Sequence, residues 1–75
     1  MREEVMAILT EIRKDVDFEN ETKLIDDSIL ASLDIVAIVG EFNDTFDVEI
    51  SVEDLIPENF NSAKALYAMV QRLQG

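Results

Sequence analysis

The stretch SLDIVAIVGEFNDTF, residues 32–46, decides the fold, because it predicts a helix that is apolar on two faces. One stripe at helical spacing is expected to enter the core, and it comprises Ile35, Ile38, Val39, Phe42 and Phe46. A second, weakly polar stripe is rotated away from the first and comprises Leu33, Val36, Ala37 and Gly40. A helix that is apolar around most of its circumference is usually central in a bundle. A chain of 75 residues can hardly cover such a helix on all sides, so part of the second stripe should be exposed.

The segments on either side of this helix predict further helices. Residues 2–14 place apolar side chains at positions i, i+3, i+4 and i+7, namely Val5, Ile8, Leu9 and Ile12. The last helix is expected to begin near Asn61–Ser62, both good caps, and to continue to Gly75. Its inner face would comprise Ala63, Leu66, Tyr67, Val70 and Leu73.

The connecting segments differ in length and character. Residues 15–31 show no sustained periodicity and predict a long loop, which apolar residues such as Leu24 and Leu30 would anchor to the core. Residues 47–50 predict a short extended connector, and residues 52–56 predict one helical turn that ends at Pro57. The expected fold is therefore all-α: a single domain over residues 1–75, built as a small four-helix bundle with three main helices, one short helix and a long first loop.

The composition favours helices and limits how the chain is stabilised. Two Gly and one Pro argue against a turn-rich β fold, and without Cys or His neither disulfides nor a zinc site can staple the domain. No apolar run approaches the roughly 18 residues that a membrane span requires. The first residues, Met1–Glu4, do not resemble a signal peptide, so a cytoplasmic location is expected.

The charge restricts the class of partner. Seventeen acidic and six basic residues give a net charge of −11, and no Lys or Arg occurs between Lys23 and Lys64. That window carries ten carboxylates: Asp26, Asp27, Asp34, Glu41, Asp44, Asp47, Glu49, Glu53, Asp54 and Glu58. Such a surface would repel nucleic acid and anionic membranes, so we expect no binding of either. The expected partners are basic protein surfaces, and the protein itself is expected to be a monomer.

Enzymatic and metal sites are disfavoured. The usual general base, His, and the strongest nucleophile, Cys, are both missing, so we expect a protein that is not an enzyme and has no catalytic residues. A metal-responsive loop is a weaker possibility, because Asp15, Asp17, Glu19 and Asp26 have the spacing of calcium-binding loop positions. Asn20 stands where such a loop requires Gly, so a solvated acidic loop without metal is the favoured interpretation.

Ser32 has two interpretations. As a structural residue, it would be the N-cap of the helix that it opens, a role worth about 1 kcal/mol. As a functional residue, it would carry a phosphoester, which the amides and dipole at a helix N-terminus would favour. The second interpretation gains weight because Leu33 follows directly and carboxylates flank the helix.

The sequence resembles the acyl carrier protein family over essentially the whole chain. Ser32–Leu33 match the last two positions of the family's Asp-Ser-Leu attachment motif, and the stretch from Phe46 to Ile50 follows at the family's spacing. The approach from Leu24 to Leu30 looks closest to stand-alone D-alanyl carriers and related bacterial carriers.

The resemblance implies an acyl-carrier-like bundle in which Ser32 bears a covalent 4′-phosphopantetheine arm that comes from coenzyme A. The arm would hold acyl or aminoacyl cargo as a thioester, after attachment by a phosphopantetheinyl transferase and loading by a ligase or acyltransferase. The family's docking positions correspond to Leu33, Asp34, Val36, Ala37, Gly40 and Asp44.

One residue departs from the family pattern. Ala31 stands where carriers nearly always have Asp, a carboxylate associated with recognition by the transferase. An intact Asp-Ser pair occurs one helical turn earlier, at Asp27–Ser28, but it would shift the spacing to Phe46 by four residues, so Ser32 is preferred. The alternative function is an acidic interaction module with the carrier fold that is poorly modified or not modified.

Overall fold

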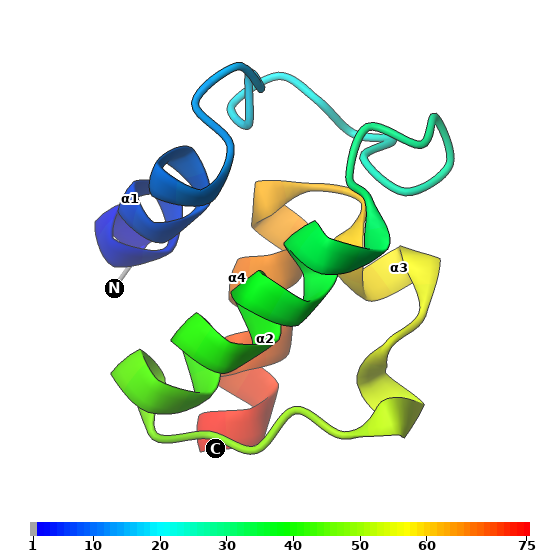
Figure 1. The fold of residues 1–75 in the computed structure, drawn as a ribbon. Helices are drawn as coiled ribbons and strands as arrows, with labels where there is room; N and C mark the ends of the chain where they lie inside the picture. Colours follow the sequence, from blue (N-terminus) through cyan, green and yellow to red (C-terminus); the bar gives the residue numbers. More distant parts are fainter. Residues whose placement is uncertain (1) are drawn as a thin grey trace.

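The computed structural model describes residues 2–75, in which α4, and not α2 as expected, contacts all the other helices (Figure 1). The elements are α1 (Arg2–Ile12), α2 (Ser32–Phe46), the 3₁₀ turn η1 (Val52–Asp54), the short α3 (Pro57–Phe60) and α4 (Ala63–Gln74). No strand occurs among residues 2–75. The helices α1, α2 and α4 contact one another, and α3 packs against α4. The predicted all-α bundle with three main helices and one short helix is confirmed.

The core lies where α1, α2 and α4 meet. From α2 it receives Ile38, Phe42 and Phe46, and the rings of Phe42 and Phe46 meet edge to face at 5.4 Å. The other main helices contribute Val5, Leu9, Leu66, Met69 and Val70. Burial of these apolar side chains supplies most of the free energy of folding, because residues 2–75 contain no buried polar or charged residue.

The two apolar stripes of α2 are separated as the sequence predicts, with one refinement. Leu33 and Val36 of the second stripe are 82% and 67% exposed. In the first stripe, Ile35 and Val39 are only half-buried and pack against the edge of the core. The fully inward line is therefore Ile38, Phe42 and Phe46, which follow one another at four-residue spacing on a single side of the helix.

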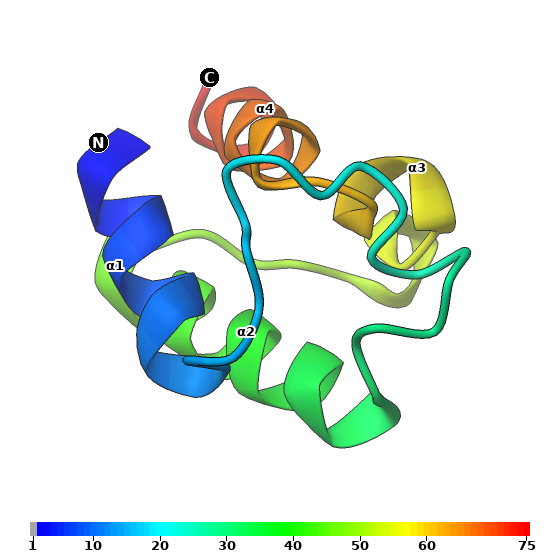
Figure 2. The same cartoon turned by 90° about the horizontal axis from the view of Figure 1, so that it is seen from above.

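The first loop contains two hydrogen-bonded turns, and the second of them, over residues 23–28, precedes α2. The loop runs from the end of α1 past the start of α4 and the end of α3 before it reaches α2 (Figure 2). The amide of Ile29 donates to the carbonyl of Leu24, and the amide of Ser28 donates to that of Ile25, both at 2.9 Å. Together with the left-handed φ of 57° at Ser28, these bonds form a Schellman motif.

Asn61, which is distant in the sequence, binds the backbone at the start of this turn. Its Oδ1 accepts hydrogen bonds from the amides of Ile25 (2.9 Å) and Asp26 (3.1 Å), and its carbonyl accepts one from Leu24 (2.9 Å). Leu24 and Leu30 are buried, so the loop is anchored to the core as predicted. Asn61 therefore caps the loop, whereas Ser62 caps α4 by accepting from the amide of Ala65 at 3.0 Å.

Two predicted boundaries are wrong. The first helix ends at Ile12 instead of residue 14. The helical turn predicted over 52–56 covers only Val52–Asp54, and Pro57 begins α3 instead of only ending a turn. The reason is that Ile56 is extended (φ −119°, ψ 152°), as a residue before proline prefers, while the fixed φ of Pro57 suits the first position of a helix.

The left-handed conformation of Ser28 generates a stability prediction. Ser28→Gly should raise the free energy of unfolding by about 0.5–1 kcal/mol, because glycine adopts positive φ without the steric cost that a Cβ carries. Thermal unfolding followed by circular dichroism measures the change, with Ser28→Ala as the matched control, which should not stabilise the protein. A lower melting temperature for Ser28→Gly would contradict the assigned conformation.

Candidate functional site

The candidate site is the N-terminus of α2. Ala31 occupies the N-cap position with extended backbone (φ −90°, ψ 170°), and its carbonyl accepts the helix bond from the amide of Ile35 at 3.1 Å. The prediction that Ser32 is the N-cap is therefore wrong. Ala31 is the N-cap, and Ser32 is the first residue of the helix itself. Ser32 is exposed. Ser28, the other serine considered, lies in the Schellman motif and not at the start of a helix.

The helix start carries half of a capping box. Asp34 Oδ2 accepts a hydrogen bond from the amide of Ala31 at 2.9 Å. The reciprocal bond is missing, since the methyl group of Ala31 cannot accept one from the amide of Asp34. Nothing in the side chain at position 31 satisfies the free amides of the first turn.

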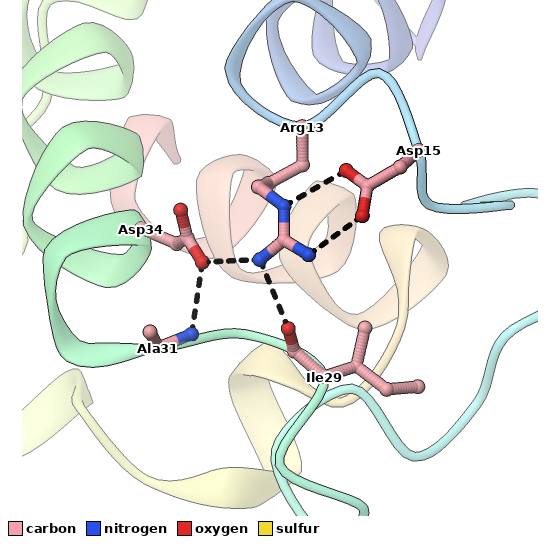
Figure 3. A network of polar contacts seen from close by, with 5 residues as sticks. All are labelled: Arg13, Asp15, Ile29, Ala31 and Asp34. Atoms are coloured by element: carbon pink, nitrogen blue, oxygen red, sulfur yellow. Dashed lines mark hydrogen bonds and ion pairs between the residues drawn. The ribbon is translucent and has the colours of Figure 1, made fainter.

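Arg13 joins the end of α1 to this helix start (Figure 3). Its Nη1 donates to Asp34 Oδ2 at 2.7 Å and to the carbonyl of Ile29 at 3.1 Å. Its Nε and Nη2 donate to the two carboxylate oxygens of Asp15 at 2.9 and 2.8 Å, the paired geometry that suits a guanidinium. One side chain thus holds Asp15, the backbone before Ser32 and the carboxylate after it.

The two carboxylates of α2 that are expected to dock partners differ in exposure. The side chain of Asp34 is only 16% exposed and pairs with Arg13, whose side chain is 28% exposed. Asp44, the other acidic residue expected to dock partners, is exposed near the far end of α2. Docking by both stays a prediction, but the Oδ2 of Asp34 is already occupied within the molecule.

The Arg13 cluster shifts two ionisation equilibria. The hydrogen bond from Arg13, followed by one from the backbone, lowers the pKa of Asp15 from 3.8 to about 2. The hydrogen bonds to Asp15 and Asp34 raise the pKa of Arg13 above its ordinary value. Both groups therefore remain charged throughout the neutral pH range.

Exposed apolar side chains occur in two places, on α2 just after Ser32 and around η1. Leu33 and Val36 project from α2, and Val52, Leu55 and Ile56 are exposed around η1. A pocket of about 200 Å³ opens between the start of α2 and α3, lined by Ile25, Ile35, Leu55, Ile56, Pro57 and Phe60. Ile35, which follows Ser32 by about one helical turn, contributes to the pocket, whereas Ser32 itself does not line it. Ala37 is half-buried and Gly40 is exposed, with open space where a side chain would project.

The charged residues divide the molecule into two unlike parts. All six cations belong to α1, the first loop and α4, so α2, η1 and α3 carry none. Exposed carboxylates on and between these base-free elements are Glu41, Asp44, Asp47, Glu49, Glu53 and Glu58. A basic partner is therefore attracted to the elements that carry Ser32, Leu33 and Val36.

Two other regions are weaker candidates for a functional site. A depression of about 1140 Å³ between α1, residues 16–22 and the start of α4 contains none of the predicted attachment or docking residues, although Asp17 and Glu19 of the loop with calcium-like spacing line it. In the loop with calcium-like spacing, Asp15 is held by Arg13 and Asp17 accepts from Asn20 at 2.8 Å. Residues 2–75 hold no group of three or more potential metal-ligating side chains. The absence of a metal in the function stays a prediction.

Arg13 is the residue that the sequence-based prediction missed. It lies 21 positions before Asp34, and no periodic pattern connects a residue at the end of one helix with the first turn of the next. The available signal was Asp34 itself, three residues after the N-cap, a position at which a carboxylate folds back onto the backbone.

The comparisons with known proteins leave the family unassigned. The sequence matches no protein-family model and no curated protein. Within residues 2–75, every helix is too short or too polar to cross a membrane. The resemblance to acyl carrier proteins therefore rests on the residues quoted above.

The missing cap at Ala31 generates a second stability prediction. Ala31→Ser should raise the free energy of unfolding by about 1 kcal/mol, because a hydroxyl at the N-cap accepts from a free amide of the first turn. In a chain of this length that corresponds to a rise in melting temperature of roughly 4–8 °C. The matched control is Ser32→Ala, one residue along, which should change stability little because Ser32 is not the cap. The opposite ranking would show that Ser32 caps the helix.

The lowered pKa of Asp15 generates a pH prediction. Asp15 binds its proton more weakly in the folded protein, so its charge stabilises the fold above about pH 4 and that contribution is lost as the pH falls through about 2. Wild type should therefore be more stable than Asp15→Asn at neutral pH, and the difference should shrink between about pH 4 and about pH 2. Melting temperatures of both proteins across this range measure it. A difference that does not change with pH would contradict the ion pair.

Proposed function

We propose that the protein is a carrier that bears a 4′-phosphopantetheine arm on Ser32 and presents acyl or aminoacyl cargo to partner enzymes. The observation that carries this proposal is an exposed serine at the first position of a 15-residue helix, directly followed by the exposed Leu33. A helix N-terminus favours a phosphodiester at this place through its amides and dipole. The reactive thiol belongs to the arm, so the absence of Cys from the chain is no obstacle.

The surroundings of Ser32 support a carrier in two further ways. Leu33 and Val36 form an apolar strip on α2, one of the elements that carry no cation, which suits transient docking of enzymes with basic surfaces. The apolar pocket between the start of α2 and α3, about 200 Å³, is smaller than the roughly 300–1,000 Å³ of sites that enclose larger ligands. It therefore favours a short acyl or aminoacyl group over a long chain.

A second candidate function follows from Ala31. Without a carboxylate at this position, the same fold would serve as an acidic interaction module in which α2 docks partners but Ser32 stays unmodified. This second function would depend only on Leu33, Val36 and the exposed carboxylates.

Intact-protein mass after coexpression with a phosphopantetheinyl transferase tests the proposal. The wild type should gain the mass of one phosphopantetheine. Ser28→Gly should gain it equally, and Ser32→Ala should not. A gain that survives Ser32→Ala would overturn the assignment.

Ala31→Asp separates the two candidate functions in the same experiment. Modification of Ala31→Asp but not of the wild type would favour the unmodified interaction module. If neither the wild type nor Ala31→Asp is modified, the proposed carrier function is overturned.

A further inference from the structure

The backbone on both sides of Ser32 is tied to one guanidinium group. Arg13 Nη1 binds the carbonyl of Ile29, three residues before the serine, and the carboxylate of Asp34, two residues after it. The same carboxylate oxygen accepts from the amide of Ala31. Residues 29–34 are thus closed into a ring of hydrogen bonds through a side chain from the end of α1 (Figure 3).

This ring compensates for the incomplete N-cap. Ala31 offers no side-chain acceptor, so the helix start depends on Asp34 reaching back to the backbone. A carboxylate that is largely removed from solvent needs a paired charge, and Arg13 supplies it. The hydrogen bond from a charged guanidinium to a carboxylate is also among the stronger ones in proteins.

We propose that Arg13 is a positioning residue for the modification of Ser32. It acts through Asp34, which it holds against the amide of Ala31, and so keeps residues 29–34 in the conformation that a transferase binds. The role rests on the proposed carrier function. The ordering of residues 29–34 can nevertheless be measured without any transferase.

Loss of Arg13 should affect the kinetics of modification, because residues 29–34 would then have to become ordered when the transferase binds. Without Arg13, only a fraction of molecules would hold Ser32 correctly, and the apparent affinity for the transferase would fall by that fraction. We expect Arg13→Ala to lower kcat/KM for transfer from coenzyme A by about tenfold, mainly through KM, with kcat within about twofold. The kinetics are measured with Ala31 in place, because Asp at position 31 would itself cap α2 and remove the need for Arg13.

Arg72→Ala is the matched control. It removes the same charge from an exposed arginine of α4 whose hydrogen bond goes to Asn59 (2.8 Å), away from α2. Its kcat/KM should stay within about twofold of the parent, because only the long-range attraction changes. Arg13→Lys retains the charge without the forked geometry and should lie between the parent and Arg13→Ala.

Amide hydrogen exchange provides the independent readout. In Arg13→Ala, the amides of Ala31 and Ile35 should exchange about tenfold faster, whereas that of Val70 in α4 should change far less. Adding Ala31→Ser to Arg13→Ala should restore slow exchange at Ile35, since the hydroxyl supplies the missing cap. If Arg13→Ala does not fold, Arg13→Lys is used for both measurements.

The outcomes separate this inference from the carrier function. Faster local exchange together with a higher KM supports the positioning role. Equal effects of Arg13→Ala and Arg72→Ala on kcat/KM would overturn it while leaving Ser32 as the attachment site. Uniformly faster exchange in α2 and α4 would also overturn it, because Arg13 would then support the whole fold. Failure of every protein to be modified would instead overturn the carrier function, and the positioning role with it.

Discussion

The structure depends on one constraint: α2 is apolar on two faces, and the chain can bury only one of them. Ile38, Phe42 and Phe46 fill the space between α1 and α4, which commits that side of the helix to the core. Leu33 and Val36 are then left in solvent, since the chain provides no further main helix to cover them. In the proposed function, these two side chains belong to the surface that partner enzymes contact.

The charge distribution follows the same division. The base-free elements α2, η1 and α3 carry the exposed apolar side chains, while all cations lie on α1, the first loop and α4. Repulsion among the carboxylates disfavours the compact state, and Arg13 offsets part of it where α1 and α2 meet. The Arg13 cluster therefore connects stability to the candidate site, because the residue that neutralises Asp34 also orders the backbone around Ser32.

The sequence predicts the fold well where periodicity is strong. The bounds of α2 and the exposure of Leu33 and Val36 follow from apolar spacing, whereas the anchoring of the first loop follows from its isolated apolar residues. Periodicity fails at short elements: the extended conformation of Ile56 moves the predicted turn, so that Pro57 starts a helix of its own. The sequence also gives the wrong N-cap. Serine is a better capping residue than alanine, but the backbone places Ala31 at the N-cap.

The candidate site is predicted only in part, for a physical reason. Ser32, Leu33 and Val36 share one helix, so their common exposure can be derived from local spacing. The contacts of Arg13 with Ile29 and Asp34 depend on how α1 meets α2, which no local pattern encodes. The pocket between α2 and α3 depends likewise on Ile25, Ile35 and Phe60 converging from three segments.

The central claim is that Ser32 is the chemically distinct residue of this chain. It is tested most directly by mass spectrometry of the protein isolated from its native host. Trypsin leaves residues 24–64 as one peptide because no Lys or Arg lies between Lys23 and Lys64, and fragment ions then distinguish Ser28 from Ser32. The account predicts a phosphopantetheine arm on Ser32, with any cargo attached as a thioester. An unmodified Ser32, or an arm on Ser28, would contradict it.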